Sequence, residues 1–161
     1  TNLVLPRMRN MNTGRIIYIS SVLGFVAMPS RGAYVASKFA VEGLVGTLRL
    51  ELRDTNIKLS SIQPGPIESK FRENAYLAFK QNIDISKSHY QNQYKIMIKR
   101  LKSGQNVKFT LPPEAVLKCA IHALESSNPK NYYRVTFPTK LFSILGKIFP
   151  SKWMDYILNQ S

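Results

Sequence analysis

The sequence predicts an α/β fold with an open parallel sheet, because a strand, a long helix and a second strand follow one another within the first 63 residues. Residues 15–20 form a nearly continuous apolar and β-branched run, which is typical of a central strand buried on both faces. Residues 33–54 repeat apolar side chains at helical spacing. Residues 57–63 form a second strand-like run that ends at Pro64. Two strands joined in this way should be parallel, with a right-handed crossover.

The other elements follow from local signals along the chain. Residues 1–8 resemble the end of a helix, and residues 22–32 form a loop rich in glycine and proline. Residues 70–112 are polar and basic, with helical stretches near 71–79 and 90–102, and we expect them to form an excursion over the site. A helix should begin near Pro113 and run to about residue 126, followed by a short strand at 132–137. The tail, 138–161, contains two short apolar helical segments broken at Pro150.

Composition indicates one compact domain in a chain of 161 residues that is 44% hydrophobic. The single cysteine, Cys119, excludes an internal disulfide and favours a reducing, cytoplasmic compartment. Only two histidines are present, so no metal site is expected. The sequence has neither a run of some 18 apolar residues nor a signal peptide pattern.

The net charge of +14 favours anionic partners in general. Nucleic acid, an anionic membrane surface and a phosphate-bearing cofactor are the three candidates. A solvated basic face is the favoured interpretation, because the basic residues lack the aromatic interleaving and the motifs of nucleic-acid readers. We therefore expect no nucleic-acid partner.

Tyr34 and Lys38 lie four residues apart in the predicted long helix, so their side chains share one face. A free phenol loses its proton near pH 10, and a tyrosine that acts as a base near neutral pH therefore needs a cation close to it. Ligands of open parallel sheets bind beyond the carboxyl ends of the strands. Ser21 leaves the first of these ends and the loop 64–69 leaves the second, so all these residues should share one neighbourhood.

Three motifs in this order resemble the short-chain dehydrogenase/reductase family, of the classical type. They are the strand with its double serine at 17–21, the Tyr34-x-x-x-Lys38 pair thirteen residues after Ser21, and the loop 64–69 with the pattern Pro-Gly-Pro-Ile-x-Ser. The resemblance implies a Rossmann-like doubly wound parallel sheet. Residues 1–137 would be the carboxyl-terminal portion of that domain, with 70–112 as a substrate lid and 138–161 as an apolar helical tail.

The resemblance also implies an oxidoreductase that transfers a hydride between NAD(P)(H) and an alcohol or carbonyl substrate, which we expect to be apolar. Tyr34 would be the general acid/base that moves a proton to or from the substrate oxygen. Lys38 would support that role and bind the nicotinamide ribose, and Ser21 would hydrogen-bond the substrate oxygen. Family members commonly form homo-oligomers.

The loop after the second strand would complete the cofactor site. Ile67 and Ser69 fall where the family holds the nicotinamide carboxamide, and Pro64 and Gly65 shape the loop. The cofactor would be NADP or NAD, with NADP slightly favoured.

The chain departs from the family pattern in its amino-terminal part. The glycine-rich cofactor turn and the catalytic asparagine are absent from the sequence, so the sheet should be incomplete. A second hypothesis is therefore a truncated or inactive binding module that acts at an anionic membrane surface. The apolar tail with lysines at its edges suits such a surface, although packing against the body or a subunit is the favoured interpretation.

Overall fold

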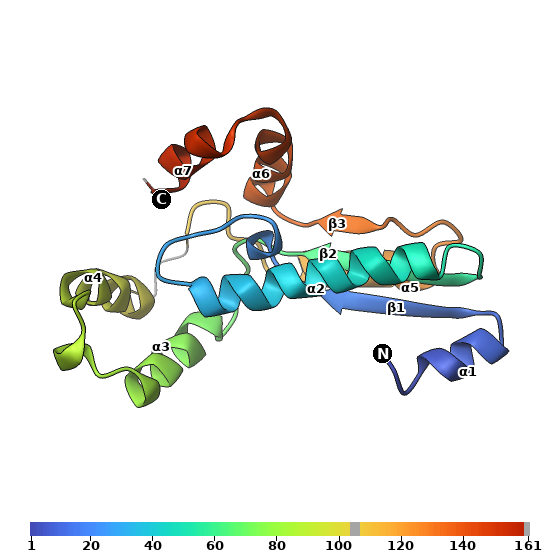
Figure 1. Ribbon diagram of the computed structural model, residues 1–161, viewed down its shortest axis with the longest axis horizontal. Coiled ribbons are helices and arrows are strands. Elements are labelled where there is room, and N and C mark those ends of the chain that lie inside the picture. Colours follow the sequence, from blue (N-terminus) through green and yellow to red (C-terminus); the bar gives the residue numbers. More distant parts are fainter. Residues whose placement is uncertain (104–106, 160–161) are drawn as a thin grey trace.

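The computed structural model describes residues 1–103 and 107–159 and has a three-stranded sheet with helices on both faces (Figure 1). Its strands are β1 (Gly14–Ile19), β2 (Ile57–Gln63) and β3 (Tyr132–Arg134), in the order β1-β2-β3. Both pairs are parallel, and β1 pairs with β2 from Gly14↔Ile57 to Ile19↔Ile62. The predicted α/β class and the parallel pairing are confirmed.

The sequence pattern suggests that β1 is a central strand, but the central strand of the sheet is β2. Every residue of β2 except Lys58 is buried, whereas β1 is half-buried and Ile19 is exposed. Within the described residues β1 pairs on one edge only, and this position leaves its second edge uncovered. The prediction that residues 15–20 are buried on both faces is therefore wrong for this chain.

The strand β3 is shorter than expected, whereas the helices agree closely with the sequence pattern. Within the described residues the helices are α1 (Leu5–Asn10), α2 (Gly32–Glu51), α3 (Phe71–Asn82), α4 (Gln91–Lys102), α5 (Glu114–Glu125), α6 (Phe137–Ile148) and α7 (Ser151–Asn159), with short 3-10 turns η1 (Val22–Gly24) and η2 (Ile85–Lys87). Residues 104–106 of the expected excursion and 160–161 of the tail lie outside the described residues.

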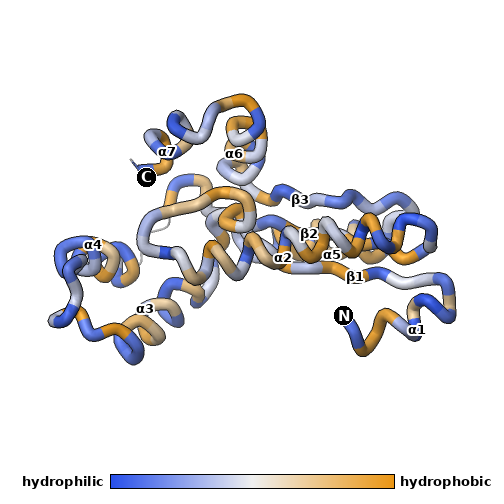
Figure 2. The backbone as a smooth tube through the Cα atoms, viewed as in Figure 1, coloured by the Kyte–Doolittle hydropathy of each residue, from blue (hydrophilic) through white to orange (hydrophobic). Residues whose placement is uncertain are grey.

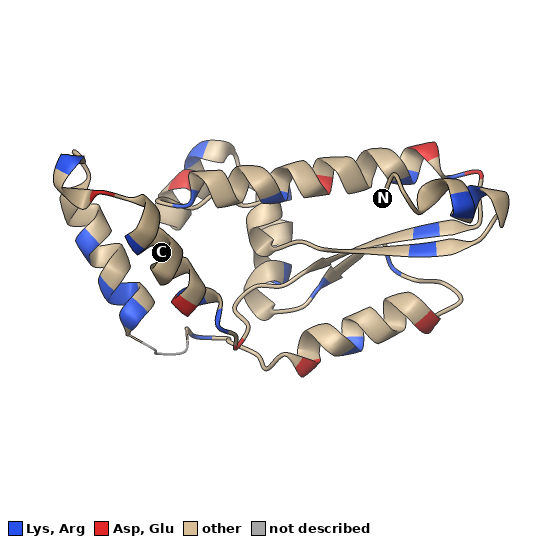
Figure 3. Ribbon diagram, turned by 90° about the horizontal axis from the view of Figure 1, so that it is seen from below, with Lys and Arg blue, Asp and Glu red and all other residues tan. Residues whose placement is uncertain are grey.

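The core has one cluster on each face of the sheet. Leu48 and Leu52 of α2 pack on Ile57 and Leu59 of β2. On the opposite face, α5 packs a second cluster against β2 and β3, made of Ile62, Ala123 and Tyr133. Figure 3 shows the strands between the long helix α2 and the helix α5. The sheet is therefore covered on both faces, as in a doubly wound fold.

Two helical pairs extend from this body (Figure 1). The α3–α4 pair lies beyond the amino-terminal end of α2 and is held together by an edge-to-face contact between Phe79 and Tyr94. The α6–α7 pair follows β3 and includes the predicted break at Pro150. No helix in residues 1–103 and 107–159 has the length and apolar character needed to cross a membrane.

Candidate functional site

The first turns of α2 bring Tyr34 and Lys38 to the carboxyl end of β1. The Lys38 ammonium donates a hydrogen bond to the carbonyl of Ile19, the last residue of β1, at 3.0 Å. The same nitrogen lies 5.7 Å from the centre of the Tyr34 ring. An ammonium has three donors, so this hydrogen bond fixes its position and leaves two for a ligand.

Ser21 follows β1 directly and is buried. Its hydroxyl oxygen accepts a hydrogen bond from the backbone N–H of Leu23 at 3.1 Å and so caps η1. Since the oxygen accepts in this contact, the hydroxyl hydrogen can still be donated elsewhere. Ser21 can therefore serve as a fixed hydrogen-bond donor at this edge of the sheet.

The loop after β2 lies against the loop after β1. The N–H of Val22 donates to the carbonyl of Pro64 at 2.8 Å, which joins the two strand ends. Farther along the loop, the N–H of Leu111 donates to the carbonyl of Pro66 at 3.1 Å, and Ile67 forms a parallel bridge with Leu111. Residues 64–67 are thus fixed at the edge that carries Ser21.

Gly65 is in the tightest part of this loop. A Cβ atom at this position would lie 2.1 Å from the hydroxyl of Thr136 and 2.8 Å from that of Thr139. Both threonines are fully buried, and their hydroxyls are 2.9 Å apart. Glycine is therefore required by space, because α6 begins directly against the loop.

Ser69 lies outside this fixed part and is exposed. Its hydroxyl is 3.5 Å from the carbonyl of Ile67 and 3.4 Å from the N–H of Phe71, both weak contacts. The side chain is thus available at the start of α3. Ser69 lies near the other predicted site residues because Phe71, two residues later in the chain, contacts Tyr34.

Phe71 is a site residue that the sequence did not indicate. Its ring packs edge-to-face on the Tyr34 ring, with the centres 5.4 Å apart. This contact joins the start of α3 to the start of α2 and gives Tyr34 an apolar neighbour. Contacts between residues so far apart in sequence carry no periodic signal, so the pattern alone could not find it.

Arg31 ends the loop before α2 and adds positive charge beside Tyr34. Burial lowers the pKa of its guanidinium, and the charges of Arg100 and Arg72 lower this pKa further, while Tyr34 acts in the opposite direction. Its guanidinium also donates to the sulfur of Met28 at 2.9 Å. The surroundings of Tyr34 are therefore both apolar, through Phe71, and cationic.

Glu42 lies one helical turn after Lys38 and joins α2 to the strand β2. Its carboxylate accepts a hydrogen bond from the fully buried hydroxyl of Ser61, at 2.7 Å. A Cβ atom on Gly24 would lie 2.8 Å from the Cγ of Glu42, so η1 packs directly on this part of α2. No local sequence signal pairs Glu42 with Ser61, because the two residues lie on different elements, 19 positions apart.

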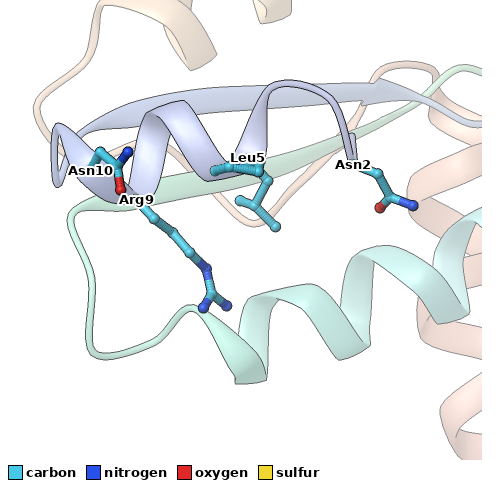
Figure 4. Close-up of a pocket in the computed structure, with 5 residues that line it drawn as sticks. Asn2, Leu5, Arg9 and Asn10 are labelled. Carbon is cyan, nitrogen blue, oxygen red and sulfur yellow. The ribbon is translucent and has the colours of Figure 1, made fainter.

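A shallow hollow lies elsewhere, on α1. It is lined by Asn2, Leu5, Pro6, Arg9 and Asn10. The side chains of Leu5 and Arg9 point from α1 toward the carboxyl-terminal part of α2 (Figure 4). The residues that line it do not include any of the predicted site residues.

Comparisons with known proteins show which family the sequence matches. The sequence pattern described as short chain dehydrogenase matches residues 1–78. The uncharacterized oxidoreductase YbbO of Escherichia coli (strain K12) is 39% identical over 155 residues, which are 96% of this chain and 52% of that protein. The chain thus spans about half the length of the curated relatives it matches.

Solved structures share the fold. A short chain dehydrogenase/reductase from Burkholderia phymatum in complex with NAD superposes with a TM-score of 0.66 at 22% identity, covering 98% of this chain and 53% of that one. A short chain dehydrogenase from Burkholderia cenocepacia J2315 in complex with NADP gives a TM-score of 0.63 at 18% identity, covering 95% and 50%. At these identities the likeness concerns the fold alone.

Proposed function

Because the chain belongs to the short-chain dehydrogenase/reductase family, we propose that a complete protein containing it is an NAD(P)-dependent oxidoreductase acting on an alcohol or carbonyl substrate. The observation that carries the proposal is the Lys38 ammonium, which is fixed on the Ile19 carbonyl and lies 5.7 Å from the Tyr34 ring centre. A cation fixed beside a phenol stabilises the phenolate and suits proton transfer.

The residues present fit the nicotinamide and ribose end of the cofactor. Lys38 retains two ammonium donors for ribose hydroxyls. The loop 64–67 is half-buried and joined to the end of β1 through the 2.8 Å hydrogen bond between Val22 and Pro64. Ile67 and Ser69 would hold the carboxamide, while Pro64 and Gly65 keep the loop close to the sheet. A bound NAD(P)(H) would supply or accept the hydride.

The chain's own residues would then handle the proton and the substrate oxygen. In carbonyl reduction the Tyr34 hydroxyl would donate its proton to that oxygen, and in alcohol oxidation the phenolate would take the proton back. The Ser21 hydroxyl would donate a hydrogen bond to the same oxygen, since its own oxygen already accepts from Leu23. Such a donor favours the developing negative charge during reduction.

The substrate we propose is apolar, because Phe71 provides an apolar surface directly beside Tyr34. The helices α3 and α4 would form the outer wall of the substrate site, as Phe71 opens α3. We further propose NADP over NAD, since the net charge of +14 favours the cofactor with the additional phosphate.

A homo-oligomer would use the outer face of α2. Phe39 and Leu50 are exposed there, and no described atom lies within 4 Å of a Cβ built on Gly43 or Gly46. These glycines would permit close approach of a second helix. We also propose that the protein is cytoplasmic, because its single cysteine, Cys119, is a free thiol and the cytosol keeps thiols reduced.

Carbonyl reduction by the complete protein tests the proposal. We expect reduction of an apolar aldehyde with NADPH, and a raised KM for NADPH together with a lowered kcat in Lys38→Met. The matched control is Lys58→Met, an exposed lysine on β2 away from the site, which should leave both constants within about twofold. Absence of reduction with both NADPH and NADH, or equal effects of the two variants, would refute the proposal.

A further inference from the structure

The helix α6 packs with its polar side facing the body. Thr139 and Ser143 are buried, together with Thr136 just before the helix. The opposite side carries a stripe of exposed apolar side chains spaced four, three and four residues apart: Phe137, Leu141, Ile144 and Ile148. A surface helix ordinarily buries its apolar stripe and exposes its polar one. The body of the protein therefore leaves most of the apolar stripe uncovered; at its first residue, the Phe137 ring packs on Phe109, with the centres 5.0 Å apart, and Phe137 stays 56% exposed.

The stripe continues through the turn at Pro150 into α7. Phe149, Trp153 and Tyr156 are exposed, and the rings of Phe149 and Trp153 lie 6.4 Å apart. We call these seven residues of α6, the turn and α7 the tail face. Figure 2 shows orange segments between white and blue ones along α6 and α7, the two helices that follow β3. A contiguous apolar surface of this kind marks an interaction site.

The charges around the tail face are all positive over a long stretch. Residues 126–154 contain five Lys or Arg and no Asp or Glu. Lys140, Lys147 and Lys152 lie on the two helices and are exposed, and Asp155 is the first acidic residue after them. A second copy of this face would bring three more lysines against these three, which opposes self-association. Anionic lipid headgroups would instead complement them.

We propose that the tail face is an interfacial anchor that binds the protein to an anionic membrane surface. The aliphatic side chains would enter the boundary of the acyl chains, and the lysines would contact anionic headgroups. Trp153 and Tyr156 suit the same depth, where amphipathic rings collect. This anchor goes beyond the proposed oxidoreductase activity and does not depend on it.

Vesicle cosedimentation of the complete protein tests the anchor. We expect binding to phosphatidylcholine vesicles that contain about a third phosphatidylserine, and much weaker binding to phosphatidylcholine alone. Ile148→Gln should weaken the binding about fivefold or more, since an exposed isoleucine no longer enters the lipid. The matched control is Ile96→Gln on α4, because Ile96 is 71% exposed and Ile148 is 69% exposed. Replacing the three lysines by glutamine should weaken binding by about tenfold or more.

Fluorescence of Trp153, the only tryptophan of this chain, gives an independent readout. Its emission, taken as the difference from Trp153→Phe, should shift to the blue on anionic vesicles and be quenched by brominated lipid. Binding that ignores lipid charge, equal effects of Ile148→Gln and Ile96→Gln, or a tail face that instead mediates lipid-free dimerisation would overturn the proposal. Reduction of a water-soluble carbonyl by Ile148→Gln, measured alongside, separates failure of the anchor from failure of the enzyme.

Discussion

Replacing Gly65 by alanine should destabilise the protein and displace the loop that leaves β2. The added Cβ would lie 2.1 Å from the Thr136 hydroxyl, whereas ordinary contact begins at 3.4 Å. Thr136 and Thr139 are fully buried and hydrogen-bonded to each other, so neither hydroxyl can move aside freely. Overpacking of this kind costs about 1–3 kcal/mol, and loss of the threonine hydrogen bond adds about 1 kcal/mol.

Urea unfolding of the complete protein measures the loss of stability. A raised Michaelis constant for NAD(P)H would show that the loop after β2 is displaced. A matched control is Gly146→Ala in α6, where no described atom lies within 4 Å of the new Cβ. That variant should gain up to about 1 kcal/mol, because alanine is the better helix former. The double variant with Thr136→Ala should recover part of the loss at Gly65 by removing the nearest atom.

A free energy of unfolding for Gly65→Ala within about 0.5 kcal/mol of the unaltered protein, a difference ordinary for surface changes, would contradict the expected clash. Additive effects of Thr136→Ala and Gly65→Ala, without coupling, would contradict it as well. Either result would mean that the start of α6 does not press on the loop 64–67.

Three further changes test other parts of the site and core. Phe71→Ala should lower kcat/KM for an apolar carbonyl by about tenfold, because Phe71 packs on Tyr34. Leu124→Ala on α5 is the control, since Leu124 is 54% exposed and Phe71 is 55% exposed, and it should not lower kcat/KM; equal losses would contradict the role of the Phe71 contact. Arg31→Met should leave the free energy of unfolding within about 0.5 kcal/mol of that of the unaltered protein. The reason is that burial and the charges of Arg100 and Arg72 lower the pKa of Arg31 and so disfavour its charge. A loss of stability above about 2 kcal/mol would contradict this. Burial raises the pKa of Cys119, so iodoacetamide at pH 8 should modify the folded protein more slowly than the urea-unfolded protein; equal rates would contradict the burial.

Local patterns predicted the part of the fold that positions the site. The apolar run of β2, the helical spacing of α2 and the parallel pairing of β1 with β2 all follow from residues close together in sequence. The position of Tyr34 and Lys38 at the carboxyl edge follows from the same topology, and the structure adds the contact of Lys38 with Ile19. Their chemical roles remain a prediction.

Other features depend on contacts that no local pattern encodes. An apolar run has the same sequence pattern in a central strand and in an edge strand, so the pattern could not predict that β1 is only half-buried. Phe71 meets Tyr34 only because α3 returns to the start of α2. Packing of the tail against the body or a subunit was expected, and toward the body α6 presents Thr139 and Ser143 rather than its apolar stripe. Thr139 lies beside Gly65, where a Cβ would come within 2.8 Å of the threonine hydroxyl.

The most direct test of the proposed chemistry is the rate of carbonyl reduction by Tyr34→Phe in the complete protein. Loss of the proton donor should lower kcat by about a hundredfold or more, while NAD(P)H binding, measured by fluorescence titration, stays within about twofold. Tyr90→Phe, an exposed tyrosine just before α4, is the control and should keep full activity. A kcat for Tyr34→Phe within a few fold of the unaltered enzyme would contradict the assignment of Tyr34 as the acid.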